Sequence, residues 1–562
     1  MENEIKNTIT VDGIEVELEG EKNLLEVIRK AGIDMPTFCY YPELSTYGAC
    51  RMCVFEDEKG RIDSSCSTVP RAGMVVKTNT ERLRRYRKGI LELLLANHCR
   101  DCTTCEKNEN CRLREFAAKY GLSDVRFNNT NTEHKIDNSS VCIVRDESKC
   151  ILCGACVRVC SEIQNVGAIA FTKRSSKVSV GTAFGVPLSQ TNCIGCGQCA
   201  AYCPTGAITI KNDTAKVWSA IADKDTYTTV QVAPAVRVAV GKEFGLPDGK
   251  DVMGKICTAL RFMGFDEVYD TTVGADMTVF EETAEFVEKL NRGDKLPMFT
   301  SCCPGWIRYA EKNYPEILPQ ISSCRSPMQM LAPVLHKKLD SDLKAQGKKH
   351  FHVAIMPCTA KKYEAARGEF KGMVDTVITT VELIKMIKQS GIMFEKLTAQ
   401  DPNTVYGPTS GAGVIFGVTG GVTEAVLRKA VGDCDNKTLE TISYVGVRGL
   451  EGVKEATVTL GDRELKIAVV SGLANTSALI EEIKAGKHYD LVEVMACPGG
   501  CICGGGQPRA EDADEKMLRS EGLYNADCES VIRTSQENKQ VEEILNSLGH
   551  NKHNMLHVSY VK

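Results

Sequence analysis

The sequence predicts an α/β C-terminal half, with parallel sheets flanked by helices, preceded by smaller α+β domains that are rich in cysteine. Strand-like and helix-like segments alternate through residues 229–494, which is typical of parallel sheets covered by helices. Residues 1–213 instead contain short segments separated by closely spaced cysteines. Because 562 residues exceed one ordinary hydrophobic core, we expect several domains.

Charge and composition argue against a nucleic-acid or membrane partner. The chain has 69 basic and 73 acidic residues, a net charge of −4, so neither sign dominates. The polar N-terminus has no apolar signal segment, and no apolar stretch of about 18 residues occurs, so we predict a cytoplasmic location. The 27 cysteines cluster as CxxC and CxxCxxC, which favours metal ligation over disulfides.

Residues 1–80 predict an α+β domain with one metal site. Alternating polarity over Thr8–Leu18 around Asp12-Gly13 indicates a hairpin, and Asn23–Ala31 predicts a short helix. Four cysteines follow with the spacing C-x10-C-x2-C-x12-C: Cys39, Cys50, Cys53 and Cys66. Their thiols suit either a 2Fe-2S centre or a zinc ion. Zinc sites usually contain two CxxC pairs, so this spacing favours the 2Fe-2S centre.

Residues 81–135 predict a second metal site after a helix over Glu81–Ala96. Its ligands follow the spacing H-x3-C-x2-C-x5-C: His98, Cys102, Cys105 and Cys111. The histidine completes a set that otherwise has three cysteines, and one imidazole ligand tends to raise the potential of a cluster. Cys99 is the competing ligand.

Residues 136–213 contain an internal repeat of four cysteines, the second copy followed by Pro204. The pattern is that of bacterial two-cluster ferredoxins, in which the fourth cysteine of each run binds the other 4Fe-4S cluster. This predicts two ligand sets: Cys150, Cys153, Cys156 and Cys203 in one, and Cys193, Cys196, Cys199 and Cys160 in the other.

Residues 214–562 form the last predicted domain. We interpret Thr214–Thr228 as a connecting run and Thr229–Val240 as a buried strand. Thr379 and Glu382 predict a capping box. Further helices are predicted at Val252–Met263, Met277–Asn291, Pro327–Leu339 and Thr476–Ala485, and strands at Leu296–Phe299, His352–Ile355, Thr376–Ile378, Lys466–Val470 and Leu491–Val494.

Three cysteine motifs begin just beyond predicted strand ends, where parallel sheets place their ligands: Thr300–Trp306, Met356–Glu364 and Met495–Pro508. Thiolates suit iron-sulfur clusters, and the glycines of the third motif let the backbone curl around a bulky inorganic core. We therefore predict one cluster bound by four thiols: Cys303, Cys358, Cys497 and Cys501.

Together these motifs, TSCCPGW, MPCxxKxxE and MACPGGCxxGGGQP, closely resemble those of the FeFe-hydrogenases, and the preceding domains resemble the accessory cluster domains of that family's larger members. The resemblance implies reversible reduction of protons to H2. It also implies that residues 214–562 hold an H-cluster between two lobes, with Cys501 bridging its 4Fe-4S part to a two-iron subcluster carrying CO, cyanide and a dithiolate. One 2Fe-2S and three 4Fe-4S accessory clusters, in ferredoxin-like domains, are implied as well.

By the same resemblance, a proton path runs through Cys302, Glu282, Ser322 and Glu285. Glu282 and Glu285 lie three positions apart on one predicted helix face. Without the resemblance, a solvated acidic face is the preferred interpretation, since Glu281 and Glu288 are also there. Lys289 stands where family members commonly carry arginine.

Several residues are expected to surround the two-iron subcluster. Lys361 would donate to an anionic cyanide, with a solvated surface lysine as the alternative. An apolar pocket or ordinary core packing accounts for Met356, Phe416 and Met495. The backbone of Ala233, Pro234 and Ala235 is expected to approach the subcluster.

The electron partner is predicted to be ferredoxin, or NAD-linked flavoprotein and iron-sulfur subunits. No strand-GxGxxG-helix unit carries a downstream acidic residue, so NAD chemistry would require partner chains. Hydrogenase maturation proteins are expected to insert the two-iron subcluster. The alternative class is a non-catalytic iron-sulfur electron-transfer or cluster-assembly protein. The remaining thiols are expected to be packed in the protein: Cys99, Cys142, Cys257, Cys324, Cys434, Cys503 and Cys528.

Overall fold

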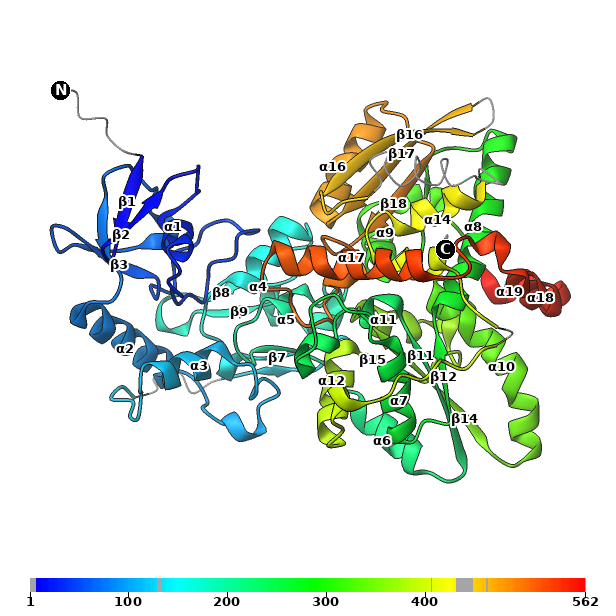
Figure 1. Ribbon diagram of the computed structural model, residues 1–562, viewed down its shortest axis with the longest axis horizontal. Helices are drawn as coiled ribbons and strands as arrows, with labels where there is room; N and C mark the ends of the chain where they lie inside the picture. Colours follow the sequence, from blue (N-terminus) through cyan, green and yellow to red (C-terminus); the bar gives the residue numbers. More distant parts are fainter. Residues whose placement is uncertain (1–6, 129–133, 406, 431–447, 461–462, 561–562) are drawn as a thin grey trace. The chain divides into compact units, whose positions relative to one another are not determined.

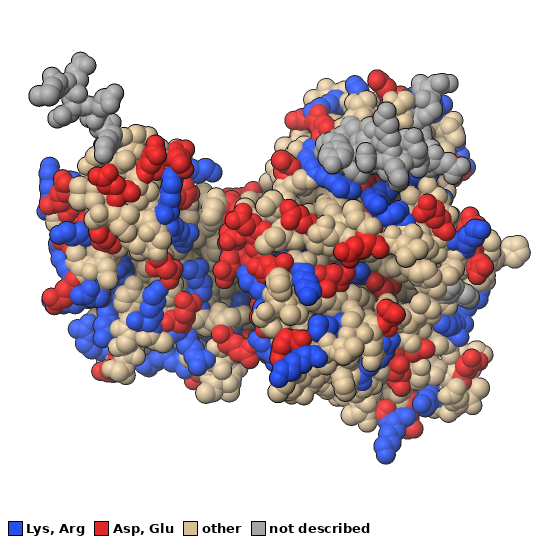
Figure 2. Space-filling view, in the orientation of Figure 1, with Lys and Arg blue, Asp and Glu red and all other residues tan. Residues whose placement is uncertain are grey.

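The computed structural model describes residues 7–128, 134–405, 407–430, 448–460 and 463–560. The chain folds into two compact units (Figure 1). The smaller unit comprises residues 1–162, 167–191 and 202–209, and the larger comprises residues 163–166, 192–201 and 210–562. Among the described residues, every helix is too short or too polar to cross a membrane. Basic and acidic side chains are interspersed on the face shown in Figure 2.

The smaller unit begins with a five-stranded sheet of order β2-β1-β5-β3-β4. Strands β1 (Thr8–Val11) and β2 (Ile14–Glu17) form the predicted hairpin, with positive φ at both Asp12 and Gly13. The predicted helix is α1 (Leu24–Lys30), capped by the Asn23 side chain. The other strands of this sheet are β3 (Val54–Asp57), β4 (Ile62–Ser64) and β5 (Val75–Lys77).

Helix α2 (Glu81–Ala96) has the predicted bounds. The remaining elements of the cysteine-rich region are short, because its metal-binding runs leave little room for regular structure. They are α3 (Arg112–Lys119), β6 (Ile136–Asp137), β7 (Ile143–Asp146), α4 (Ala155–Arg158), β8 (Ala170–Thr172), β9 (Ser179–Gly181), α5 (Gln198–Ala201) and β10 (Ile208–Ile210).

The larger unit contains a four-stranded, wholly parallel sheet of order β12-β11-β14-β15. Its strands are β11 (Thr226–Val232), β12 (Glu267–Asp270), β14 (Lys349–Met356) and β15 (Thr376–Thr379). They are covered by helices that bury an apolar face: α6 (Thr214–Ala222), α7 (Met253–Met263), α10 (Pro327–Ala345) and α12 (Thr380–Gln389). The predicted capping box of Thr379 and Glu382 begins α12.

A second sheet in this unit has the order β13-β18-β17-β16. Its strands are β13 (Met298–Phe299), β16 (Val453–Leu460), β17 (Arg463–Ser471) and β18 (Leu491–Met495). Helices α9 (Pro304–Asn313), α14 (Gly421–Ala430) and α16 (Leu473–Lys484) contact this sheet, and α11 (Ala360–Ala365) contacts β15 of the first sheet. Other helices of the unit are α8 (Thr272–Arg292) and α13 (Gly411–Val414). The predicted fold class, parallel sheets with helices after small α+β domains, is confirmed.

Several predicted elements were wrong in detail. Residues 214–228 are not a connecting run, because they contain α6 and the start of β11. The strand predicted to reach Val240 ends at Val232, since Pro234 cannot donate to a ladder and begins a 3-10 turn. Strand β16 was not predicted, and because it pairs antiparallel with β17 the second sheet is mixed. Cys528 is exposed rather than packed, and Cys434 lies outside the described residues.

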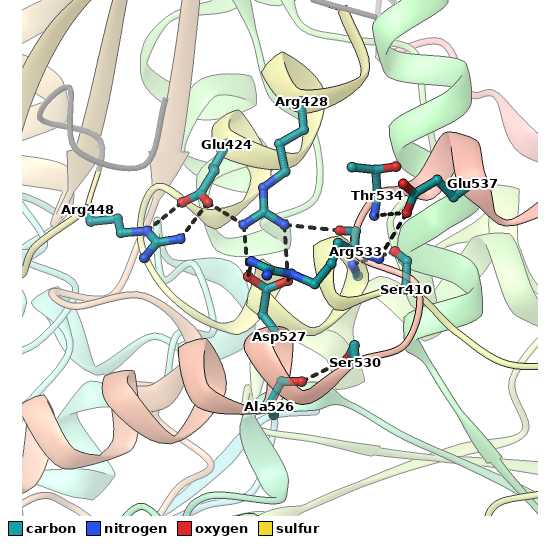
Figure 3. Close-up of polar contacts among 11 residues, drawn as sticks. Ser410, Glu424, Arg428, Arg448, Ala526, Asp527, Ser530, Arg533, Thr534 and Glu537 are labelled. Carbon is teal, nitrogen blue, oxygen red and sulfur yellow. Dashed lines mark hydrogen bonds and ion pairs between the residues drawn. The ribbon is translucent and has the colours of Figure 1, made fainter. Parts of the chain in front are cut away.

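The chain ends in three helices that the sequence did not predict: α17 (Ala513–Glu529), α18 (Lys539–Leu548) and α19 (Lys552–Leu556). A buried ion-pair network joins α17 to α14 (Figure 3). The guanidinium of Arg428 lies 3.0 and 2.8 Å from the two carboxylate oxygens of Asp527, and it also pairs with Glu424. Both carboxylates are fully buried, so this network holds α17 on the domain through desolvated charges.

Candidate active site

A cavity of about 80 Å³ lies in the larger unit, where the carboxyl ends of both sheets converge. Ala233 follows β11, Thr271 follows β12, and Met356 and Met495 end β14 and β18. Proline, alanine, methionine and Phe416 side chains form most of the wall. The cavity is therefore apolar and at the sheet edge where α/β proteins bind ligands.

The thiols of the three motifs meet at this cavity. Cys303, Cys358 and Cys501 line it, together with Cys302. Cys497 lies beside them: burial raises the pKa of its thiol, and the neighbouring Cys358 and Cys303 raise it further. Burial and then Cys303 likewise raise the pKa of Cys358 to about 12.

These mutual pKa effects test whether the residues fit an iron-sulfur cluster. Burial and neighbouring cysteines raise the pKa values of Cys358, Cys497 and Cys501, so these thiols can all become thiolates only when a cationic group lies among them. The donor set is all sulfur, which iron-sulfur clusters require. Backbone and side-chain donors already point at two of the sulfurs: Ala496 N lies 3.4 Å from Cys303 Sγ, and Gln198 Nε2 lies 3.1 Å from Cys497 Sγ. The site therefore fits the 4Fe-4S part of an H-cluster.

Glycine is required where the third motif meets the second. A Cβ on Gly504 would lie 2.1 Å from the carbonyl oxygen of Pro357, a distance that no side chain can occupy. Gly500 has φ +85°, and a Cβ there would lie 2.6 Å from Thr419 N. These close approaches explain why the motif is rich in glycine.

Lys361 is buried and lines the cavity, which excludes the solvated-lysine alternative. Its Nζ donates to the carboxylate of Glu364 at 2.8 Å and to the carbonyl of Cys302 at 3.3 Å. Burial alone would lower the pKa of Lys361, but Glu364 outweighs it and the pKa is raised. The cavity wall thus holds one ammonium group that can donate to an anionic ligand.

The four residues of the predicted proton path are neighbours in the interior of the larger unit. Cys302 is next to the buried Glu282, which contributes, after burial, to raising the pKa of the thiol. Burial, and then Glu285, raise the pKa of Glu282 to about 8. Ser322 Oγ donates to Glu285 Oε2 at 3.0 Å. Glu282 and Ser322 are fully buried, so the solvated acidic face does not describe Glu282.

The outer end of this series reaches a solvent-facing cavity of about 450 Å³ lined by Glu285, Lys289, Ser323 and His557, among others. Lys289 Nζ lies 2.9 Å from Glu285 Oε1. Ser323 Oγ bonds to Glu285 at 3.0 Å and to His557 Nδ1 at 2.8 Å. The sequence carried no signal for His557, because it comes from the C-terminal end of the chain.

We expect the raised pKa of Glu282 to make stability depend on pH. The unfolded carboxyl ionises near pH 4.5, whereas the folded one keeps its proton to about pH 8. Between these values the native state binds the extra proton, so the free energy of unfolding falls as pH rises. The Glu282→Gln variant has no carboxyl at this position, so its free energy of unfolding does not fall for this reason as pH rises. Its thermal inactivation temperature relative to wild type should therefore increase from pH 5 to pH 8.

The control is Glu288→Gln, on the same helix with its side chain about half exposed. It should show the same difference from wild type at both pH values. Equal behaviour of the two variants would contradict a neutral, buried Glu282.

The four N-terminal thiols lie together in the smaller unit. Contact with Cys39 lowers the pKa of Cys50 to about 5, and contact with Cys66 lowers that of Cys53 to about 7. Phe38 N also donates to Cys50 Sγ at 3.4 Å. The arrangement fits a four-thiolate centre.

The second predicted set contains one buried histidine, His98, and three cysteines. Nδ1 of His98 is buried and has no hydrogen-bond partner among the described residues, as expected for an atom that binds metal. Burial raises the pKa of Cys111, and Cys105 and Cys102 add to the effect. The competing Cys99 donates its backbone N–H to Ser148 O.

In the predicted two-cluster region, one cavity is lined by four cysteines of one predicted set: Cys150, Cys153, Cys156 and Cys203. The run that contains Cys193, Cys196 and Cys199 lies in the larger unit. There, Gln198 Nε2 donates to both Cys497 Sγ and the carbonyl of Cys503. A residue next to a predicted accessory ligand thus touches a thiol predicted for the main site, a contact that spacing could not predict.

Family models match the chain in five places. Residues 226–505 match "Iron only hydrogenase large subunit, C-terminal domain", and residues 513–562 match "Iron hydrogenase small subunit". Residues 6–81 match a 2Fe-2S iron-sulfur cluster binding domain, and residues 149–207 match a 4Fe-4S dicluster domain. Residues 87–126 match the NADH-ubiquinone oxidoreductase-G iron-sulfur binding region.

Similar proteins extend over almost the whole chain. The NADP-reducing hydrogenase subunit HndD of Solidesulfovibrio fructosivorans is 40% identical, and the alignment covers 99% of each chain. Iron hydrogenase 1 of Clostridium pasteurianum is 37% identical over 99% of this chain and 100% of its own. A solved structure of apo FeFe-hydrogenase HydA1 from Chlamydomonas reinhardtii, a variant, is 36% identical with a TM-score of 0.53, and covers 62% of this chain and 99% of its own.

The resemblance, the fold class and the cofactor classes predicted from the sequence are confirmed by these similarities. Identity near 40% over the full length, with an H-cluster domain behind 2Fe-2S and 4Fe-4S domains, means that this chain belongs to the FeFe-hydrogenase family and is an iron hydrogenase of the large, multi-cluster type.

Proposed function

We propose that this chain interconverts H2 with protons and electrons at an H-cluster bound by Cys303, Cys358, Cys497 and Cys501, and exchanges the electrons with NAD(P)-linked partner subunits. When bound, the H-cluster supplies the redox-active iron at which the H–H bond is made or broken. The observation that carries the proposal is the convergence of four thiols on one apolar cavity, beside neighbouring side chains that can hold a proton.

The cavity residues would hold and shield the reacting centre. The apolar wall formed in part by Met356, Phe416 and Met495 excludes water, which strengthens every electrostatic interaction inside. Lys361 offers its ammonium to an anionic cyanide ligand. The backbone of Ala233–Ala235 would approach the bound group, as its place in the cavity lining supports.

Cys302 would give or take the proton at the reacting centre, and Glu282, Ser322 and Glu285 would carry it to solvent. Each is a group that can hold a proton, and Ser322 is hydrogen-bonded to Glu285. Gln198 would position the thiolate of Cys497 and bring the neighbouring accessory cluster ligands close to the main site.

Two similarities favour NAD(P)-linked partner subunits over ferredoxin. HndD is a subunit of an NADP-reducing hydrogenase, and residues 87–126 match an iron-sulfur region of NADH-ubiquinone oxidoreductase. The test is H2-dependent reduction of NADP⁺ and NAD⁺ by the chain alone and after addition of the flavoprotein subunits. We expect NADP⁺ or NAD⁺ to be reduced only when the flavoprotein subunits are present. If the chain reduces ferredoxin but neither nucleotide, with or without those subunits, the proposal is contradicted.

Catalysis itself is tested by infrared spectroscopy of protein matured anaerobically with hydrogenase maturation proteins. We expect CO and cyanide bands that shift when H2 is admitted. Fully matured protein with intact accessory clusters but without such bands would instead indicate an electron-transfer or cluster-assembly protein.

The histidine ligand is tested by His98→Cys. A fourth thiolate should keep the 4Fe-4S cluster but lower its midpoint potential, because imidazole is neutral and thiolate is anionic. Redox titration followed by electron paramagnetic resonance measures the shift. Cys99→Ser is the control and should leave the potential unchanged, whereas loss of the cluster in Cys99→Ser would assign Cys99 as the ligand.

A further inference from the structure

Two histidines converge on one carboxylate at the amino end of β14, the opposite end from the catalytic cavity. His336 and Asp340 lie one turn apart on α10, and His350 lies on β14. Nδ1 of His336 is 3.0 Å from Asp340 Oδ2, and Nδ1 of His350 is 2.8 Å from Oδ1. One ligand atom from each residue lies within 4.8 Å of the other two.

The other nitrogen of His336 determines where its proton is. Nε2 lies 3.0 Å from the carbonyl oxygen of Met373, which can only accept, so Nε2 carries the proton. In the neutral imidazole, the lone pair of Nδ1 then faces the Asp340 carboxylate, which also only accepts. Two acceptors at this distance need a cation between them, either a second proton on the ring or a metal ion.

The hydrogen bonds around Thr229 allow a similar arrangement for His350, the second imidazole of the group. Gln231 Nε2, which also donates to Met328 O, lies 2.8 Å from His352 Nε2, so His352 carries its proton on Nδ1. That nitrogen and His350 Nε2 lie 2.7 and 2.8 Å from the hydroxyl oxygen of Thr229. A hydroxyl oxygen can accept two hydrogen bonds, so His350 can donate through Nε2 and keep a lone pair on Nδ1.

We propose that His336 Nδ1, His350 Nδ1 and the Asp340 carboxylate bind Zn²⁺, with water as the fourth ligand. Nitrogen and carboxylate oxygen are zinc ligands, and a histidine ligand is normally held by a hydrogen bond from its other nitrogen. Nε2 of His336 donates to Met373 O, and Nε2 of His350 can donate to Thr229 Oγ1. The imidazoles are largely buried, whereas the Asp340 side chain is 51% exposed, so an ion can enter from solvent.

The ion would fasten α10 to β14. Both elements reach the catalytic cavity at their other ends, through Met328 and Met356. Zinc would therefore stabilise the domain without touching the reacting centre, and the proposal does not depend on how that centre works.

The test uses the full chain with its clusters, purified anaerobically. The protein is incubated with ZnCl2, and unbound metal is then removed by gel filtration. We expect one retained zinc per chain, with a higher thermal inactivation temperature. Zinc X-ray absorption should show imidazole and oxygen ligands at about 2.0–2.1 Å, whereas zinc in a cysteine site would show sulfur at about 2.3 Å.

Asp340→Ala and His336→Gln should each lose this zinc and the added thermal stability. Asp340→Ala changes a half-exposed side chain and so should fold. The matched control is His488→Gln, which alters another surface histidine-carboxylate pair, with Asp490 at 3.1 Å, and should retain the metal. Retention of zinc by both site variants, or no zinc bound through nitrogen and oxygen in wild type, would overturn the proposal and leave a protonated His336 paired with Asp340.

Discussion

Cys302→Ser is expected to lower the H2 turnover of fully matured protein by about 10²–10⁴-fold, the range typical of a lost general acid-base group. A hydroxyl is a far weaker acid than a thiol, and Glu282 lies behind Cys302 where it cannot replace a thiol that lines the cavity. Turnover is measured with an artificial electron donor, so that the accessory partners do not limit the rate.

Infrared spectra separate loss of proton transfer from loss of the cofactor, and Cys302→Ser should keep the CO and cyanide bands. The matched control is Cys257→Ser, a fully buried thiol in the core of the first sheet, away from the cavity. It should retain turnover near that of wild type. Turnover of Cys302→Ser within a few-fold of wild type would remove Cys302 from the proton path.

Asp527→Ala is expected to destabilise the protein by about 3–5 kcal/mol, because it removes one partner of a buried ion pair. Arg428 is 1% exposed and would keep a desolvated charge beside the Glu424 carboxylate, which it shares with Arg448. The contact between α14 and α17 should weaken (Figure 3). Thermal inactivation under anaerobic conditions measures the effect.

The control is Arg533→Gln, which removes another guanidinium that pairs with Asp527, at 3.2 Å. Its side chain is 37% exposed, so water can replace the contact and the cost should stay below about 1 kcal/mol. Similar losses in the two variants would mean that burial does not decide the strength of this network.

Local pattern was sufficient for the elements whose neighbours in sequence are also their neighbours in space. The hairpin around Asp12-Gly13, helix α2 and the capping box at Thr379 all depend on residues within a few positions, and all were predicted. The prediction that failed most clearly, a strand through Val240, overlooked a local rule, because Pro234 ends β11.

Strand β16 and helices α17–α19 escaped prediction for a different reason. Strand β16 is one member of an antiparallel pair, and only its pairing with β17 places it in the sheet. Helix α17 has no strong apolar face and is held by Asp527, whose partner Arg428 lies about a hundred positions away.

The sequence by itself determined the family, the fold class and the candidate ligands, because cysteine spacing and hydrophobic periodicity are local properties that can be recognised in the sequence alone. Only the tertiary structure decided which side chains complete those sites. Gln198 beside Cys497, His557 beside Ser323, and the His336–Asp340–His350 group each join segments that packing, rather than chain order, brings within hydrogen-bond distance. Such contacts depend on the whole folded core, and no periodicity in the sequence records them.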